Sequence, residues 1–287
     1  MRGRLYGEGV RRLVRRLGAL AAVLAGAACG GCSPSVADAN GVSALYGEVH
    51  VHQFPGGVHP AALFLRQAVA ADGVTGDSVV PTAALPSRVE GPCTLTLPST
   101  CAPPCGPVPA FADGGAVHVR GGHSDGDVTL AFDAATENYA ATPPLARGAA
   151  IFSGGEMLSV SGDGAEAPAF SGSVRAPVPL ALAAPAQPLA AANGVTVAWT
   201  PDQSDRIAIS LVASTTDGRF AVLQCFVADA PGSFALPSSL LAALPAPPRD
   251  LQLEVSRDFL AHVPSVKSSD GVVVHAGWAV TVTGHED

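Results

Sequence analysis

Charged residues make up only 14% of this 287-residue chain, and aromatic residues only 5%. Lysine occurs once, as Lys267, and no cluster of basic residues follows the arginine-rich first 16 positions. Proteins that bind nucleic acid through its phosphates rely on clustered Lys and Arg side chains. The sequence therefore excludes nucleic acid as a partner, and it disfavours charge-driven binding to an anionic membrane for the same reason.

Catalytic signals are equally scarce. No glycine-rich phosphate-binding loop precedes the single lysine, and we identify no set of residues that predicts a reaction. We therefore expect a non-enzymatic protein without a cofactor. The alternative is a metal-binding protein or a metal-dependent enzyme that uses a divalent ion.

The chain also lacks an apolar run long enough to cross a membrane. The run at Leu17–Ala28 has 12 residues, whereas a spanning helix needs about 20. It follows a segment with six arginines and one acid, and it ends in small residues. This pattern is typical of a bacterial secretory signal, so we predict a signal peptide over residues 1–28.

The residues after this run extend the prediction. Ala27 and Ala28 precede Cys29, which resembles the lipobox of bacterial lipoproteins. The resemblance implies a lipid such as palmitate on Cys29, a tether over residues 29–42, and a location in the cell envelope, at the outer membrane or facing the periplasm. Ordinary cleavage nearby, which would release a secreted soluble protein, is the alternative. Without residues 1–28 the chain has 10 basic and 23 acidic residues, a net charge of −13.

Four further cysteines are candidates for disulfide bonds. Exported proteins commonly form disulfides, because the compartments outside the cytoplasm are oxidising. The candidates are Cys93, Cys101, Cys105 and Cys225. Four cysteines allow three pairings, and the spacing does not choose among them.

The remaining composition favours β-structure. With 32 glycines and 25 prolines, the chain is poor in helix-forming segments, and short stretches of alternating apolar and polar residues recur along it. We predict an all-β fold of two β-sandwich-like (Ig-like) domains, over residues 43–176 and 177–287, joined at a proline-rich seam. One short helix is expected near 237–244, and the segment 60–71 fits either a helix or a strand.

Several short segments carry a resemblance to a known group of proteins. They are Phe152–Glu156, Pro168–Gly172, Val195–Thr200, Cys225, Phe234–Pro237 and Leu240–Pro245. With these segments, and over roughly residues 43–287, the chain is similar to uncharacterised, mostly β predicted lipoproteins of high-GC Gram-negative bacteria. The resemblance implies a β fold and a lipid anchor, and it supplies no activity.

Two histidines form the candidate metal site. His50 and His52 are two residues apart in a segment that alternates like a strand, so their side chains share one face. Glu48 shares that face and His59 follows the next turn, which makes a third ligand available. The competing interpretation places both histidines on the solvated side of an edge strand. We expect an envelope protein with a binding or structural role, whose protein or glycan partner the sequence does not identify.

Overall fold

The computed structural model describes residues 43–68, 87–97, 110–121, 127–185, 189–263 and 272–287. In these residues the protein is nearly all β, with three sheets and a single four-residue helix. The predicted all-β, sandwich-like fold is confirmed. No helix in this part of the chain is long and apolar enough to span a membrane.

The largest sheet has nine strands, and the two smaller sheets have five and three. The large sheet contains, in spatial order, β3 (Ser87–Glu90), β4 (Cys93–Thr96), β14 (Phe220–Val227), β13 (Arg206–Thr215), β16 (Arg249–Val263), β17 (Val272–Glu286), β1 (Ser43–Phe54), β2 (Gly57–Ala68) and β5 (Ala110–Phe111). The five-stranded sheet contains β10 (Phe170–Arg175), β9 (Met157–Gly162), β6 (Val117–Arg120), β7 (Asp127–Asp133) and β8 (Asn138–Ala141). The three-stranded sheet contains β11 (Leu182–Ala184), β12 (Thr196–Trp199) and β15 (Ser233–Ala235).

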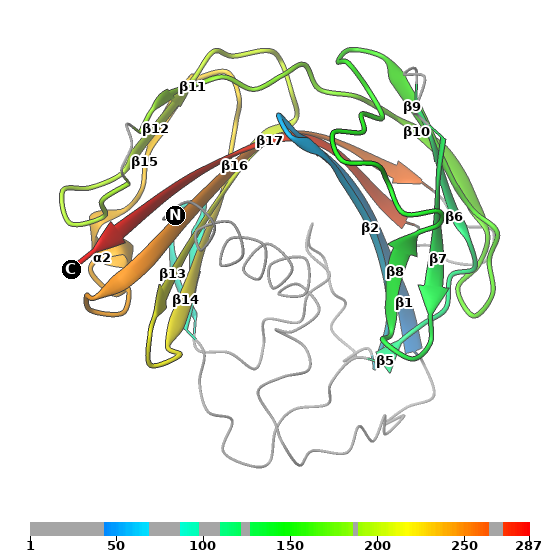
Figure 1. The fold of residues 1–287 in the computed structure, drawn as a ribbon, viewed down its shortest axis with the longest axis horizontal. Helices are drawn as coiled ribbons and strands as arrows, with labels where there is room; N and C mark the ends of the chain where they lie inside the picture. Colours follow the sequence, from blue (N-terminus) through cyan, green and yellow to red (C-terminus); the bar gives the residue numbers. More distant parts are fainter. Residues whose placement is uncertain (1–42, 69–86, 98–109, 122–126, 186–188, 264–271) are drawn as a thin grey trace, which may run out of the picture.

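The large sheet bends into an arch, and each smaller sheet covers the outside of one arm (Figure 1). Each smaller sheet encloses its own apolar core. One core lies under β11, β12, β15 and the helix α2 (Ser238–Leu241), and the other lies under the five-stranded sheet. Burial of these apolar side chains is the main stabilising contribution to both layers.

The long hairpin of β16 and β17 holds the two arms together. Both strands have 15 residues, and they are paired from Arg249–Glu286 to Val263–Val272. Their alternate side chains enter one core near one end and the other core near the opposite end, and Trp278 packs against both. The large sheet thus contains strands from both predicted domains, 43–176 and 177–287. The division into two domains stays a prediction.

Strands predicted from alternation occur where expected. The ambiguous segment 60–71 is a strand as far as it is described, because it belongs to β2, which pairs antiparallel with β1. The segments around 116–120 and 127–132 form the predicted hairpin. The predicted helix is confirmed at Ser238–Leu241, where Pro237 precedes its first residue.

The segment 220–227 forms β14, an internal strand of the large sheet. Its sequence predicts burial on both faces, but Gln224 and Phe226 are exposed on one of them. Its other face carries Cys225, which lies opposite Cys93 of β4 and forms a disulfide with it. The remaining candidates, Cys101 and Cys105, lie outside the described residues, as does Cys29.

Candidate metal centre

The face of the large sheet turned away from both cores, here called the inner face, is rich in histidine. Paired residues of neighbouring strands point to the same side of a sheet, so the strand register identifies the members of this face. It carries six of the eight histidines: His50, His52, His59, His262, His275 and, far along β17, His285. One row crosses five strands, as His59, His52, Gly277, Asp258 and Arg206.

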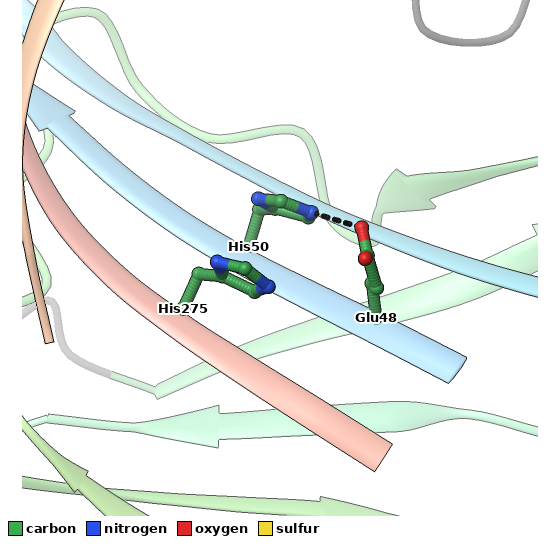
Figure 2. A group of neighbouring side chains, drawn as sticks. All are labelled: Glu48, His50 and His275. Carbon is green, nitrogen blue, oxygen red and sulfur yellow. Dashed lines mark hydrogen bonds and ion pairs between the residues drawn. The ribbon is translucent and has the colours of Figure 1, made fainter. Parts of the chain in front are cut away.

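Parallel pairing of β1 with β17 places His275 beside His50. The two imidazole rings are stacked, with centroids 4.3 Å apart and planes inclined by 13°. Glu48, two residues before His50 on β1, places Oε2 2.9 Å from His50 Nε2. Figure 2 shows the stacked rings with the Glu48 carboxylate beyond one edge.

These three side chains can supply ligands to a metal ion. One ligand atom from each of Glu48, His50 and His275 lies within 4.8 Å of the other two. Zinc and copper bind imidazole nitrogen and carboxylate oxygen at about 2.0–2.2 Å, so a small contraction would complete a three-ligand site. Stacked rings direct their nitrogen lone pairs along nearly parallel lines, so one ring must turn to meet the ion. His50 is 33% exposed and has the freedom to do so.

Arg206 fixes the protonation of His275. Its Nη2 lies 3.1 Å from His275 Nδ1. Because a guanidinium only donates, Nδ1 is the acceptor and the proton of the neutral ring lies on Nε2. His275 Nε2 has no hydrogen-bond partner among the described residues, and the side chain is only 2% exposed. This buried, unpartnered nitrogen can bind a metal ion once its proton has moved to Nδ1.

Burial keeps the central histidines neutral. It lowers the pKa of His275 well below the usual value, and the neighbouring His50 and Arg206 lower it further. Burial also lowers the pKa of His52 to about 4, against a smaller opposing effect of the Asp258 charge. Neutral imidazole is the form that binds metals, so at neutral pH protons do not compete for these two rings.

A second pair of unpartnered atoms lies beside the first group. His52 Nε2 and Asp258 Oδ1 are buried and have no hydrogen-bond partner within the described chain. Asp258 Oδ2 lies 3.4 Å from Arg206 Nε, so the carboxylate shares this guanidinium with His275. The Arg206 guanidinium also lies over the Phe226 ring, 4.4 Å from its centroid.

The predicted site residues therefore separate into two neighbouring positions. Glu48 and His50 come together with His275, whereas His52 lies in the next row, its ring centroid 5.5 Å from that of His50. β1 lies between β17 and β2, so the interpretation of these histidines as residues of an edge strand is wrong.

Sequence reasoning missed His275, Asp258 and Arg206. Each is a polar residue at an alternate position of an otherwise apolar strand, which indicates a second, polar face. Alternation alone does not reveal which strands become neighbours. The parallel pairing of β1 with β17, from opposite ends of the described chain, leaves no local signal.

The sequence contains one Gly-x-Ser-x-Gly pattern, Gly122-His123-Ser124-Asp125-Gly126, which is typical of a serine nucleophile. These residues lie outside the described part, between β6 and β7. The flanking strands form an antiparallel hairpin, whereas the nucleophile motif joins a strand to a helix. The strands on either side of this pattern therefore differ from the strand and helix that flank the nucleophile motif.

A shallow hollow of about 250 Å³ lies elsewhere, between β7 and residues 142–149. Its lining includes Pro143, Pro144 and Leu145, and only Asp127 among its residues is charged. It lacks converging polar groups, which distinguish a binding site from a surface depression. The inner face is therefore the better candidate.

Comparison with known proteins gives no further guide, because no family model, no curated protein and no solved structure matches this chain.

Proposed function

We propose that this protein is an exported, non-enzymatic component of the cell envelope that binds a divalent transition-metal ion at Glu48, His50 and His275. The observation that carries the proposal is the convergence of three ligand atoms from two strands within 4.8 Å of one another. Imidazole and carboxylate together favour zinc or copper over calcium or magnesium, which prefer oxygen ligands alone.

Neutral, buried imidazole also supports this function. His275 stays uncharged at neutral pH because burial disfavours its charged form. Its neighbour Glu48 supplies a negative charge that offsets part of the charge of the ion. The ion takes the place of the proton that His50 Nε2 shares with Glu48 Oε2.

The location of the protein is proposed from the sequence. An arginine-rich start, a 12-residue apolar run and Ala27-Ala28-Cys29 support export followed by acylation of Cys29. The metal site would then act outside the cytoplasm, on a protein tethered to the membrane by its lipid. Binding or storage of the ion requires no catalytic group, which agrees with the non-enzymatic role proposed here.

Metal content tests the function. The protein is stripped with a chelator, dialysed against Zn²⁺ and analysed for bound metal. We expect wild type to retain zinc at this site and the Glu48→Gln/His50→Gln variant to lose it. The matched control is His285→Gln, an exposed histidine that contacts Asp250 and Asp287. Equal zinc content in all three proteins would overturn the assignment.

Intact mass spectrometry of the protein from its native envelope tests the anchor. A diacyl or triacyl mass on Cys29 is the expected result. An unmodified chain that begins before Cys29 would mean a released protein and would leave the metal site to be judged by its own experiment.

A further inference from the structure

We propose that His52 and Asp258 form a second metal-binding position, next to the first, above the backbone of Gly277. This second position rests on the metal-binding function proposed above and extends it to a centre for two ions. It assigns ligand roles to a half-buried imidazole, whose Nε2 is itself buried, and to a buried carboxylate, neither of which the first position uses.

The geometry centres on the missing side chain of Gly277. A Cβ at this residue would stand 2.7 Å from Asp258 Oδ1 and 2.9 Å from His52 Nε2. The two atoms therefore approach the same point from β16 and β1, on either side of β17. Any residue other than glycine would fill that point with its own side chain.

Both atoms need a partner there. Asp258 is 1% exposed, and neither Asp258 Oδ1 nor His52 Nε2 has a hydrogen-bond partner among the described residues. Leaving a buried polar atom unsatisfied costs about 1–3 kcal/mol, and more for a charged group. A carboxylate oxygen accepts only, and neutral His52 can present a lone pair at Nε2. A group that satisfies both is therefore a cation or a double donor.

The Asp258 carboxylate pairs with Arg206 through Oδ2, which leaves Oδ1 for a second cation. Glu254 lies on the same face of β16, four residues before Asp258. Burial and the charge of Asp258 both raise the pKa of Glu254. A cation at Asp258 would relieve this repulsion between the two carboxylates. The first position lies close by, since the rings of His50 and His52 are 5.5 Å apart.

A water molecule at the same point would also satisfy both atoms, and zinc stoichiometry distinguishes the two. Gly277→Ala places a methyl group at the shared point and displaces the flexible ends of His52 and Asp258. The matched control is Gly56→Ala, because a Cβ there meets nothing within 4 Å. Asp258→Asn and His52→Gln repeat the test by replacing each proposed ligand while Gly277 is kept.

The experiment is equilibrium dialysis of the purified protein against Zn²⁺, with bound metal counted per chain. We expect two ions in wild type and in Gly56→Ala, and one ion in Gly277→Ala, Asp258→Asn and His52→Gln. The Glu48→Gln/His50→Gln variant should also keep one ion. One ion in wild type, unchanged by Gly277→Ala and Asp258→Asn, would overturn the second position and leave the proposed function standing. No ion in wild type would overturn both.

Discussion

Arg206 donates a hydrogen bond from Nη2 to Nδ1 of His275 across 3.1 Å, from a strand two places away in the sheet. The same guanidinium lies 3.4 Å from a carboxylate oxygen of Asp258. A metal ion on His275 Nε2 takes the position of the ring proton, which must then move to Nδ1. Since Nδ1–H and the guanidinium are both donors, binding requires Arg206 to leave His275 and keep only Asp258.

Replacing Arg206 should therefore strengthen metal binding. Arg206→Gln removes a nearby positive charge and frees His275 Nδ1 to carry the proton, and we expect zinc affinity to rise about tenfold. Titration with a competing chelator measures the change. Arg219→Gln, in which an exposed arginine paired with Asp217 is removed, is the control and should leave the affinity unchanged. Weaker binding in Arg206→Gln would mean that the guanidinium supports the metal-bound state.

The same histidines predict a loss of stability in mild acid. The pKa of His52 is about 4 in the folded protein, below the ordinary value of 6.5 for an unfolded chain. Between these values the unfolded chain binds the proton and the folded chain does not. The contribution is therefore fully present above pH 6.5 and is lost as pH falls toward 4, by roughly 3 kcal/mol.

Urea unfolding between pH 7 and pH 4 measures this slope in metal-free protein. His52→Gln removes the titrating group, so its stability should change less over the same range. His285→Gln removes an exposed histidine whose pKa is raised mainly by a hydrogen bond to Asp250, so protonation of His285 favours the folded chain and this variant should lose at least as much stability as wild type. Identical slopes for wild type and His52→Gln would contradict the buried, neutral state of His52.

The disulfide between Cys93 and Cys225 should stabilise the edge of the large sheet. It joins residues 132 positions apart, and closing a loop of this length in the unfolded chain is worth about 3–5 kcal/mol in the chain-entropy description. Both cysteines are fully buried, so a reductant should act on the folded protein slowly. We expect Cys93→Ala/Cys225→Ala to unfold at lower urea concentration, and a variant as stable as wild type would contradict the estimate.

The buried ion pair between Asp229 and Arg257 lies on the side of the large sheet opposite the inner face. It should stabilise the fold about as much as the disulfide does. Asp229 accepts hydrogen bonds from Trp199 Nε1 and from the backbone of Asp202 and Ser204, and its Oδ2 lies 3.4 Å from Arg257 Nε. Burial raises the pKa of Asp229, but these hydrogen bonds and the Arg257 charge outweigh it and hold the pKa below its usual value.

Removing the carboxylate would leave the Arg257 charge buried without a counter-ion. We therefore expect Asp229→Ala to lower the free energy of unfolding by about 3–5 kcal/mol. Asp217→Ala removes an exposed aspartate from a surface ion pair with Arg219, and it should lower the free energy of unfolding far less. Similar losses for the two variants would show that burial of the pair is unimportant.

The strands could be predicted from sequence because their signal is local. Alternating residues place Val49 and Val51 on one face of β1 and His50 and His52 on the other, and this pattern requires only the neighbours along the chain. The same holds for the alternation in β13, β16 and β17. The short helix was predictable because its apolar residues lie between Pro237 and Pro245.

Only part of the candidate site could be predicted from the sequence. Glu48 and His50 belong to one strand, so their shared face follows from spacing alone. His275 joins them because β17 pairs in parallel with β1, and Asp258 and Arg206 follow because β16 and β13 come next in the sheet. Strand order depends on packing over the whole sheet, which no spacing within one segment encodes.

Crystals of the protein grown with Zn²⁺ and measured at the zinc absorption edge test the metal site most directly. We predict an anomalous peak about 2.0–2.2 Å from a carboxylate oxygen of Glu48 and from ring nitrogens of His50 and His275. The Arg206 guanidinium should then have withdrawn from His275. Anomalous peaks confined to other residues, such as the exposed His285 beside Asp250, would contradict the metal centre proposed here.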